Sequence, residues 1–186
     1  MASNRHLGRI IALQTLYEQD FRRASADSTF DLDTVLKRNI SRYEATVDDT
    51  DFIIGLVNGV DSQEAVLDEK LQPLAPEWPL KDIARMDRVV LRMGAYELLQ
   101  GKGVPPKVVI NEAVELAKAF GSENSSKFIN GVLGTLLRQQ NGEPTSPVTV
   151  APSTDDNAQA LLDDANAQVV ADDSSLDPES EKKETP

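Results

Sequence analysis

The chain has 186 residues, 27% of them charged, and a formal net charge of −12 at pH 7. Residues 141–186 hold eleven acidic residues against two lysines and carry −9 of that charge, so residues 1–140 carry only −3 and can still hold local basic patches. The absence of cysteine excludes disulfides and thiol chemistry, and no apolar run is long enough for a signal peptide or a membrane span, so a cytoplasmic protein is expected.

The first predicted helix runs from about residue 4 to residue 24 and carries basic residues at its start. Arg5 and Arg9 project from the side opposite its apolar face. They lie in the first turns, where the helix dipole is positive and a cation is slightly unfavourable. Cations added to a positive helix end make a candidate anion site. The alternative is a solvated helix face.

Apolar residues at helical spacing predict further helical regions over residues 32–45, 48–71 and 80–100. The second is either one helix or two that divide at Asp61-Ser62, and three prolines separate it from the third. Asp87 and Arg92 are polar positions of the last of these helices. An exposed ion pair between such residues contributes only ~0–1 kcal/mol. The two residues are therefore expected to be surface positions or contacts for a partner.

Two helices with clear start and stop signals follow over residues 105–120 and 125–138, and Gly121 is expected to end the first in a left-handed conformation. One side of the second helix holds two glycines between two basic residues, in the order Lys127, Gly131, Gly134 and Arg138. Each glycine inside a helix costs about 1 kcal/mol relative to alanine. Either another helix or an anionic ligand is therefore expected to approach this side closely.

No segment shows the alternation and turns of a β-hairpin. The chain is therefore predicted to be all-α, with six or seven helices in a domain of residues 1–140. The composition changes after Asn141, where prolines and clustered Asp, Ala, Gln and Ser predict a disordered acidic tail over residues 141–186.

The inventory of catalytic residue types is small. His6 is the only histidine and there is no cysteine, so neither a Cys/His metal site nor a Ser-His-Asp triad is expected. No phosphate-binding glycine motif is present. Glu112 and Glu115 share a helix surface with Lys118 and are expected to be solvated. The sequence therefore predicts no catalytic residue, no metal and no cofactor, and the protein is not expected to be an enzyme.

Four stretches between about residues 4 and 138 carry longer motifs. They are RxxAxQxLY from Arg9, DRxxLRxxxYEL from Asp87, VPxxVxINEAxELAKxFG from Val104 and SKFxNGVL from Ser126. Together they resemble the NusB family of transcription antitermination factors. The resemblance implies a fold of two packed three-helix bundles. It also implies binding of boxA-type RNA from ribosomal RNA operon leaders, with the small-subunit ribosomal protein NusE as partner, in a complex that helps RNA polymerase to read through terminators.

Carried over residue by residue, the resemblance implies a set of RNA-binding residues: Arg5, Arg9, Gln14, Tyr17, Lys127, Phe128, Asn130, Gly131 and Gly134. The arginines would hold phosphates, and a base would stack on Phe128 while RNA backbone approaches the two glycines. Tyr17 is either an RNA contact or a core residue. Asp87 and Arg92 would face the ribosomal-protein partner or brace that surface. Family members often begin with several arginines, so this chain is expected to bind RNA weakly without its partner.

Two other functions are compatible with the same residues. One is a stand-alone relative of the RNA-binding domain that is fused to ribosomal RNA cytosine methyltransferases, although no methyltransferase domain follows in this sequence. The other is a helical dimerisation or scaffold protein whose Gly131–Gly134 face packs against a second copy. The acidic tail would either compete with RNA for the basic surface or act only as a solubilising extension.

Overall fold

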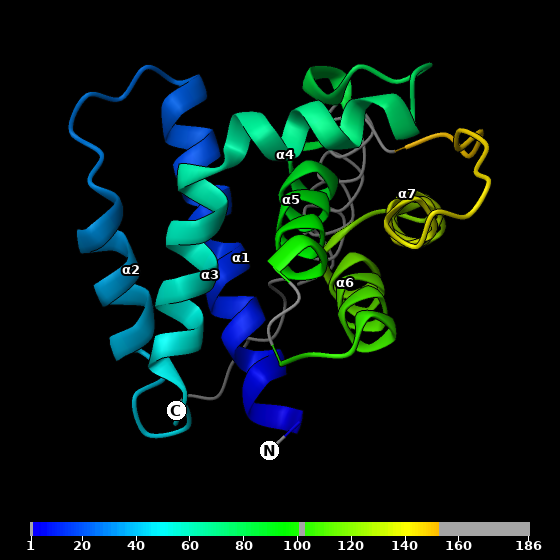
Figure 1. Ribbon diagram of the computed structural model, residues 1–186. Coiled ribbons are helices and arrows are strands. Elements are labelled where there is room, and N and C mark those ends of the chain that lie inside the picture. The colour runs from blue at the N-terminus through cyan, green and yellow to red at the C-terminus, as the bar shows by residue number, and fades with distance from the viewer. Residues whose placement is uncertain (1, 101–102, 153–186) are drawn as a thin grey trace, which may run out of the picture. The chain divides into compact units, whose positions relative to one another are not determined.

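The computed structural model describes residues 2–100 and 103–152, and within them the chain is all-helical, which confirms the predicted fold class (Figure 1). The helices are α1 (Ala2–Ala24), α2 (Leu32–Ser41), α3 (Thr50–Ser62), α4 (Glu64–Leu71), η1 (Gln72–Leu74), η2 (Leu80–Asp82), α5 (Arg85–Gln100), α6 (Pro106–Phe120) and α7 (Ser125–Gln140). None of the helices in this part of the chain combines the length and hydropathy needed to cross a membrane.

The helices form two bundles of three. Helix α1 packs against α2 and α3 in the first bundle, and α5, α6 and α7 pack against one another in the second. Helix α4 connects the bundles and packs against α5, while α1 and α3 also contact α5 directly. The buried apolar residues consequently form one continuous core across both bundles.

Local sequence signals explain where several helices start and stop. The side chains of Asp31 and Asp49 accept hydrogen bonds from the backbone N–H groups of Thr34 and Phe52, at 2.9 and 3.1 Å, and so cap α2 and α3. Helix α6 ends at Gly121 as predicted, but the predicted left-handed conformation is wrong, because its φ is −94°. Glycine is needed there for space, since an added Cβ would lie 2.5 Å from the Oγ of Ser125.

One close approach fixes how α3 packs on α5. The Tyr96 ring of α5 lies directly on Gly59 of α3, so that a Cβ added to this glycine would overlap the ring. Gly55 lies one turn earlier on α3, and a Cβ added there would meet nothing within 4 Å. The first glycine is therefore part of the interface between the bundles, and the second is not.

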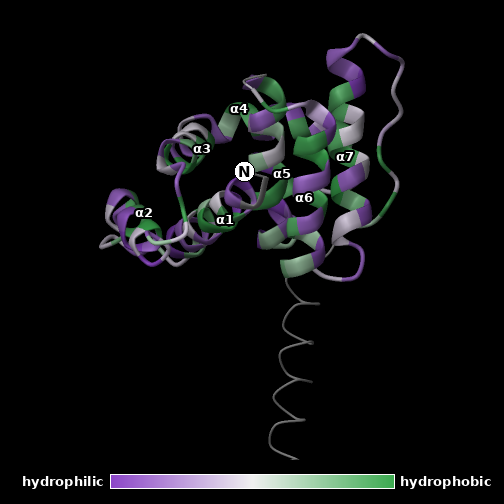
Figure 2. Ribbon diagram, turned by 90° about the horizontal axis from the view of Figure 1, so that it is seen from below, coloured by the Kyte–Doolittle hydropathy of each residue, from purple (hydrophilic) through white to green (hydrophobic). Residues whose placement is uncertain are grey.

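The folded chain continues past the domain boundary expected at residue 140. It turns at Gly142, whose φ is +72°, and runs back beside α7 (Figure 2). We call residues 143–150 the C-terminal segment. Its Val148 is only 8% exposed and belongs to the core, and the Val148 N–H donates a 2.8 Å hydrogen bond to the carbonyl oxygen of Leu74. The predicted acidic tail from residue 153 onward lies outside the described residues.

Candidate nucleic-acid interface

Arg9, one of the two predicted phosphate ligands on α1, is buried. Its side chain is 3% exposed, and its Nε and Nη2 donate hydrogen bonds of 2.9 and 2.7 Å to the two carboxylate oxygens of Glu97 on α5. Its Nη1 lies 3.5 Å from Glu112 on α6. As it lies in this structure, the Arg9 guanidinium is neutralised and enclosed by two carboxylates and is not exposed to a phosphate.

Arg5, the second predicted phosphate ligand, remains at the surface. Its side chain is 44% exposed, its guanidinium lies over the Phe52 ring, and its Nε is 3.5 Å from a carboxylate oxygen of Asp49. An exposed pair of this kind contributes at most ~1 kcal/mol, so a phosphate can replace the carboxylate. Asp48 and Asp51 are also exposed at this corner, which makes it less basic than the sequence of α1 alone indicated.

The remaining α1 candidates lie further along the same helix. Gln14 is exposed. Tyr17 is half-buried, and the guanidinium of Arg85 lies 5.7 Å from the centre of its ring. The structure thus places Tyr17 at the border between core and surface, where part of the ring remains accessible.

The α7 candidates separate into exposed and covered residues. Lys127 and Asn130 are exposed, whereas Phe128 is fully buried in the core. As it lies in this structure, the Phe128 ring has no exposed face on which a base could stack. The side of α7 that holds Gly131 is covered too: the Cγ1 of Val148 lies 3.1 Å from the position of an added Cβ. Gly134 is half-exposed.

An aromatic side chain at the end of α6 lies at the surface. Phe120, the last residue of α6, is 42% exposed. Its helical spacing predicts the apolar face of α6, but α6 ends there and the face runs out beyond the bundle. Exposed Lys118 lies one half-turn earlier, and the short turn to α7 leads to exposed Lys127. An exposed aromatic ring between lysines suits stacking on an unpaired base.

Helix α6 lies between the two groups of candidates. Glu112 of α6 is 2.9 Å from the Nδ1 of His6 on α1, and α6 packs along α7 on its other side (Figure 2). An RNA strand that contacts both Arg5 and Lys127 must therefore cross the exposed face of α6. The Glu112 carboxylate, which was expected to be solvated, is thus in contact with His6.

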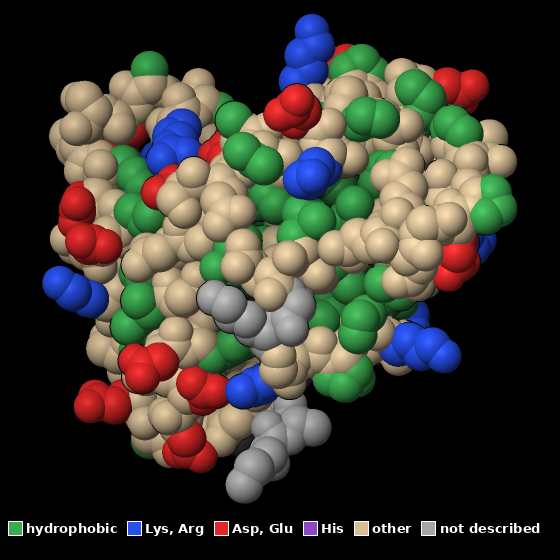
Figure 3. Space-filling view, viewed as in Figure 1, with side chains coloured by type: hydrophobic (Ala, Val, Ile, Leu, Met, Phe, Trp, Pro, Cys, Tyr) green, Lys and Arg blue, Asp and Glu red, His purple; other side chains and the backbone are tan. Residues whose placement is uncertain are grey.

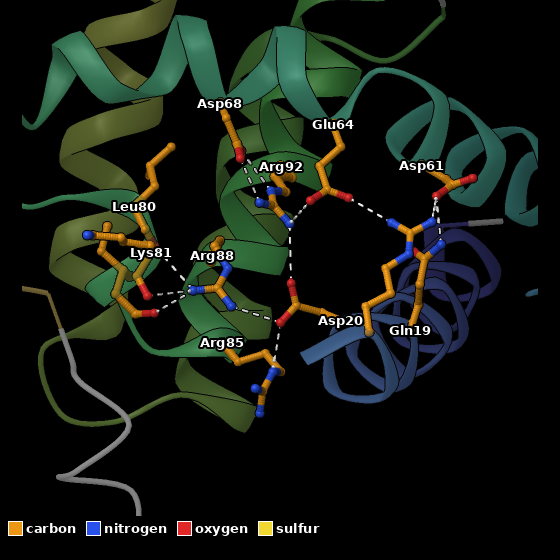
Figure 4. A network of polar contacts seen from close by, with 12 residues as sticks. Gln19, Asp20, Asp61, Glu64, Asp68, Leu80, Lys81, Arg85, Arg88 and Arg92 are labelled. Carbon is orange, nitrogen blue, oxygen red and sulfur yellow. Dashed lines mark hydrogen bonds and ion pairs between the residues drawn. The ribbon is translucent and has the colours of Figure 1, made fainter. Parts of the chain in front are cut away.

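The two predicted partner contacts, Asp87 and Arg92, are also buried, with exposures of 1% and 8%. Arg92 forms ion pairs with Asp68 at 2.7 Å, Glu64 at 3.1 Å and Asp20 at 3.4 Å (Figure 4). Arg92 therefore braces α1 and α4 against α5, and neither side chain is exposed to a partner as it lies in this structure.

Asp20 is the centre of this ion-pair network. Its carboxylate accepts hydrogen bonds from Arg85 at 2.7 Å and Arg88 at 2.8 Å (Figure 4). Burial alone would raise the pKa of the Asp20 carboxyl, but the hydrogen bonds from Arg88 and Arg85 outweigh burial, so its pKa lies below the ordinary value of 3.8.

The lowered pKa predicts how stability depends on pH. The contribution of Asp20 is complete above pH 3.8 and is lost as the pH falls through the lower pKa of the folded state. Asp20→Asn should lower the free energy of unfolding by about 1.5–3 kcal/mol at pH 7, the usual range for hydrogen bonds to charged groups. Urea denaturation at pH 7, 5 and 3.5 measures the difference in free energy of unfolding between the variant and the wild type. This difference should become smaller only at pH 3.5. Asp51→Asn, at an exposed carboxylate, is the control, and a difference that stays constant at all three pH values would contradict the assignment.

A separate apolar depression lies between α3 and α5. Figure 3 shows hydrophobic side chains gathered in the middle of this face, over the region of α5. Its lining residues include Phe52, Leu56, Tyr96 and Val104. Exposed apolar surfaces of this kind commonly mark protein–protein contacts.

Two packed helical bundles whose exposed cations surround one helix define a small α-helical binding protein, and the comparisons identify its family. The sequence model of the NusB family matches residues 6–138, and the chain belongs to the NusB family. The family resemblance seen in the motifs is thereby confirmed.

Three comparisons give the range of similarity. The transcription antitermination protein NusB of Dehalococcoides mccartyi (strain CBDB1) is 41% identical over 138 residues, which are 74% of this chain and 92% of that protein. A solved structure of NusB from T. maritima is 31% identical, with a TM-score of 0.65, over 73% of this chain and 91% of that one. A crystal structure of the antitermination factors NusB and NusE in complex with dsRNA is 23% identical, with a TM-score of 0.64, over 75% of this chain and 99% of that one, and it shows the shared fold.

Proposed function

We propose that this chain is a transcription antitermination factor that binds boxA-type RNA of ribosomal RNA operon leaders together with the ribosomal protein NusE and promotes readthrough by RNA polymerase in the cytoplasm. The observation that carries the proposal is the family match over residues 6–138, together with a relative of that name at 41% identity. The shared fold of the solved complex of NusB, NusE and dsRNA supports the pairing of RNA with a protein partner.

The exposed residues define the RNA surface that we propose. Arg5 and Lys127 contact phosphates, Gln14 and Asn130 offer hydrogen bonds to base edges, and Phe120 replaces the buried Phe128 as the stacking residue. The strand crosses α6 between the two groups. With Arg9 enclosed by carboxylates, few cations remain for phosphates, so RNA binding by the protein alone is weak and its salt dependence is shallow.

We propose that the protein acts by binding, without catalysis of its own. The carboxylate pair on α6 supports this. Glu112 is contacted by His6 and Arg9, and Glu115 forms a 2.8 Å pair with Lys118. Each carboxylate is thus engaged by a neighbouring basic group rather than paired with a second carboxylate.

Arg5→Ala should weaken binding of boxA-type and scrambled RNA equally and should reduce the slope of log K against log salt by about one, because one phosphate contact is lost. Phe120→Ser should instead lower the affinity for boxA-type RNA by about tenfold, because one base would lose its stacking partner. Fluorescence anisotropy of labelled RNA over a salt series, with and without the ribosomal protein, measures both.

Arg23→Ala is the matched control, because Arg23 is an exposed cation at the opposite end of α1, 2.7 Å from Asp61. It should leave RNA binding unchanged. Failure of the wild type to distinguish boxA-type from scrambled RNA, even with the ribosomal protein present, would contradict the proposed function. Self-association without RNA would then favour the helical scaffold, although Val148 already covers Gly131 on the face that the scaffold hypothesis requires.

A further inference from the structure

The C-terminal segment covers Gly131, which lies next to Asn130 and one turn after Lys127, two α7 residues that the proposed function assigns to RNA. The side chain of Val148 fills the space left by the absent side chain of Gly131, with its Cγ1 3.1 Å from the position of an added Cβ. The Val148 N–H is bonded to the carbonyl oxygen of Leu74, which ties the segment to η1. RNA backbone cannot reach Gly131 while Val148 is in place.

The attachment of this segment is suited to exchange. Of the described residues 143–152, only Val148 and Pro152 are buried, while Glu143, Pro147 and Val150 are exposed. The segment begins immediately after α7, so it remains next to its docking surface even when it is released. A contact made by two small apolar side chains and one backbone hydrogen bond is limited enough to be displaced, and the short tether keeps its effective concentration high.

We propose that the C-terminal segment is a built-in competitor of RNA, which docks Val148 on Gly131 and must leave before RNA occupies this side of α7. The segment follows the part of the chain that the family model matches, since that match ends at residue 138. It therefore adds a regulatory contact to the family fold. The inference rests on the proposed function, because it assigns the α7 surface to RNA.

The effect on affinity follows from the fraction of open molecules. If nine in ten molecules hold Val148 in place, only about one-tenth can bind RNA at Gly131. The apparent affinity for RNA is then about tenfold lower. The contact is apolar, so the competition should persist at high salt. Competition by the acidic residues further along the chain would instead weaken as salt screens the charges.

The first test compares two valines of the same segment in the full chain. Val148→Ser removes the buried side chain and should raise the affinity for boxA-type RNA by about three- to tenfold at both low and high salt. Val150→Ser makes the same chemical change at an exposed position, 39% accessible, and should leave the affinity unchanged. Thermal melting followed by circular dichroism verifies that both variants are folded.

A second test fixes the segment in place. The position of an added Cβ at Gly131 lies 4.0 Å from the Cβ of Val148, within the range that a disulfide requires. The chain has no cysteine of its own. The double variant Gly131→Cys with Val148→Cys can therefore form one defined bond. Its oxidised form should bind RNA at least tenfold more weakly than its reduced form. The comparison within one variant removes the effect of the new side chains themselves.

The outcomes separate this inference from the function on which it rests. Tighter binding by Val148→Ser together with weaker binding by the oxidised double variant supports the competitor. If boxA-type RNA binds specifically but neither change alters its affinity, the competitor is overturned and the proposed function stands. If no variant binds boxA-type RNA specifically, even with the ribosomal protein, both are overturned.

Discussion

Arg9→Ala is expected to lower the free energy of unfolding by about 3–5 kcal/mol, a loss large enough to unfold a marginal domain. The guanidinium and the carboxylate of Glu97 are 3% and 8% exposed and share two hydrogen bonds. Removing one partner leaves the other charge buried without compensation. Urea denaturation followed by the helical circular dichroism signal measures the loss.

Two variants sharpen this result. Arg5→Ala removes an exposed arginine four residues away on the same helix and should change the free energy of unfolding by less than ~1 kcal/mol. Arg9→Met combined with Glu97→Leu removes both buried charges and should recover much of the loss. A stability of Arg9→Ala within ~1 kcal/mol of the wild type would mean that the ion pair is open in solution, and would restore Arg9 as a candidate phosphate ligand.

The expected loss also decides which variants are useful for RNA binding. A variant without Arg9 loses RNA affinity through unfolding, whatever the residue contacts in the complex. Arg5 and Lys127 are exposed and can be changed without this ambiguity.

The second large effect is expected at Gly59, where alanine should destabilise the protein by about 2 kcal/mol, the upper end of the overpacking cost less the gain in helix propensity. Alanine favours a helix by about 1 kcal/mol over glycine. The added methyl group would overlap the Tyr96 ring, however, and overpacking of a filled core typically costs 1–3 kcal/mol and occasionally more. Thermal melting and urea denaturation of the purified variant test the prediction.

Gly55→Ala is the matched control on the same helix. Because an added Cβ there meets nothing within 4 Å, the gain in helix propensity is unopposed and should stabilise the protein by up to about 1 kcal/mol. The free energy of unfolding is therefore expected to fall in Gly59→Ala and to rise in Gly55→Ala. Similar shifts of either sign would show that the Tyr96 ring moves aside at little expense.

Local patterns were sufficient for the helices but not for the surfaces they leave exposed. The spacing of apolar residues is a property of neighbouring positions, so the helices could be predicted. The caps at Asp31 and Asp49 were identified only in the structure. The carboxylate that encloses Arg9 is 88 positions away in the sequence. The periodicity of one helix shows which residues share a face, but it does not show what covers that face.

The prediction at the glycine side of α7 was correct in part. Two glycines indicated a close approach, and Gly131 is indeed closely approached. The approaching group is Val148, which directly follows a proline in a stretch whose composition is typical of disorder. Two buried side chains, Val148 and Pro152, do not produce a periodic pattern, so this contact could be found only from the structure.

The two ionic clusters on α1 have a mechanical consequence for complex formation. Arg9 pairs with Glu97 near the end of α5, and Asp20 pairs with Arg85 near its beginning, so the antiparallel helices are fixed at two points. The points are about 16 Å apart along α1, at 1.5 Å per residue. Rocking one bundle about the other would have to break one of the two clusters. The bundles should therefore move as a single rigid body when a partner binds, with adjustments confined to side chains and the C-terminal segment.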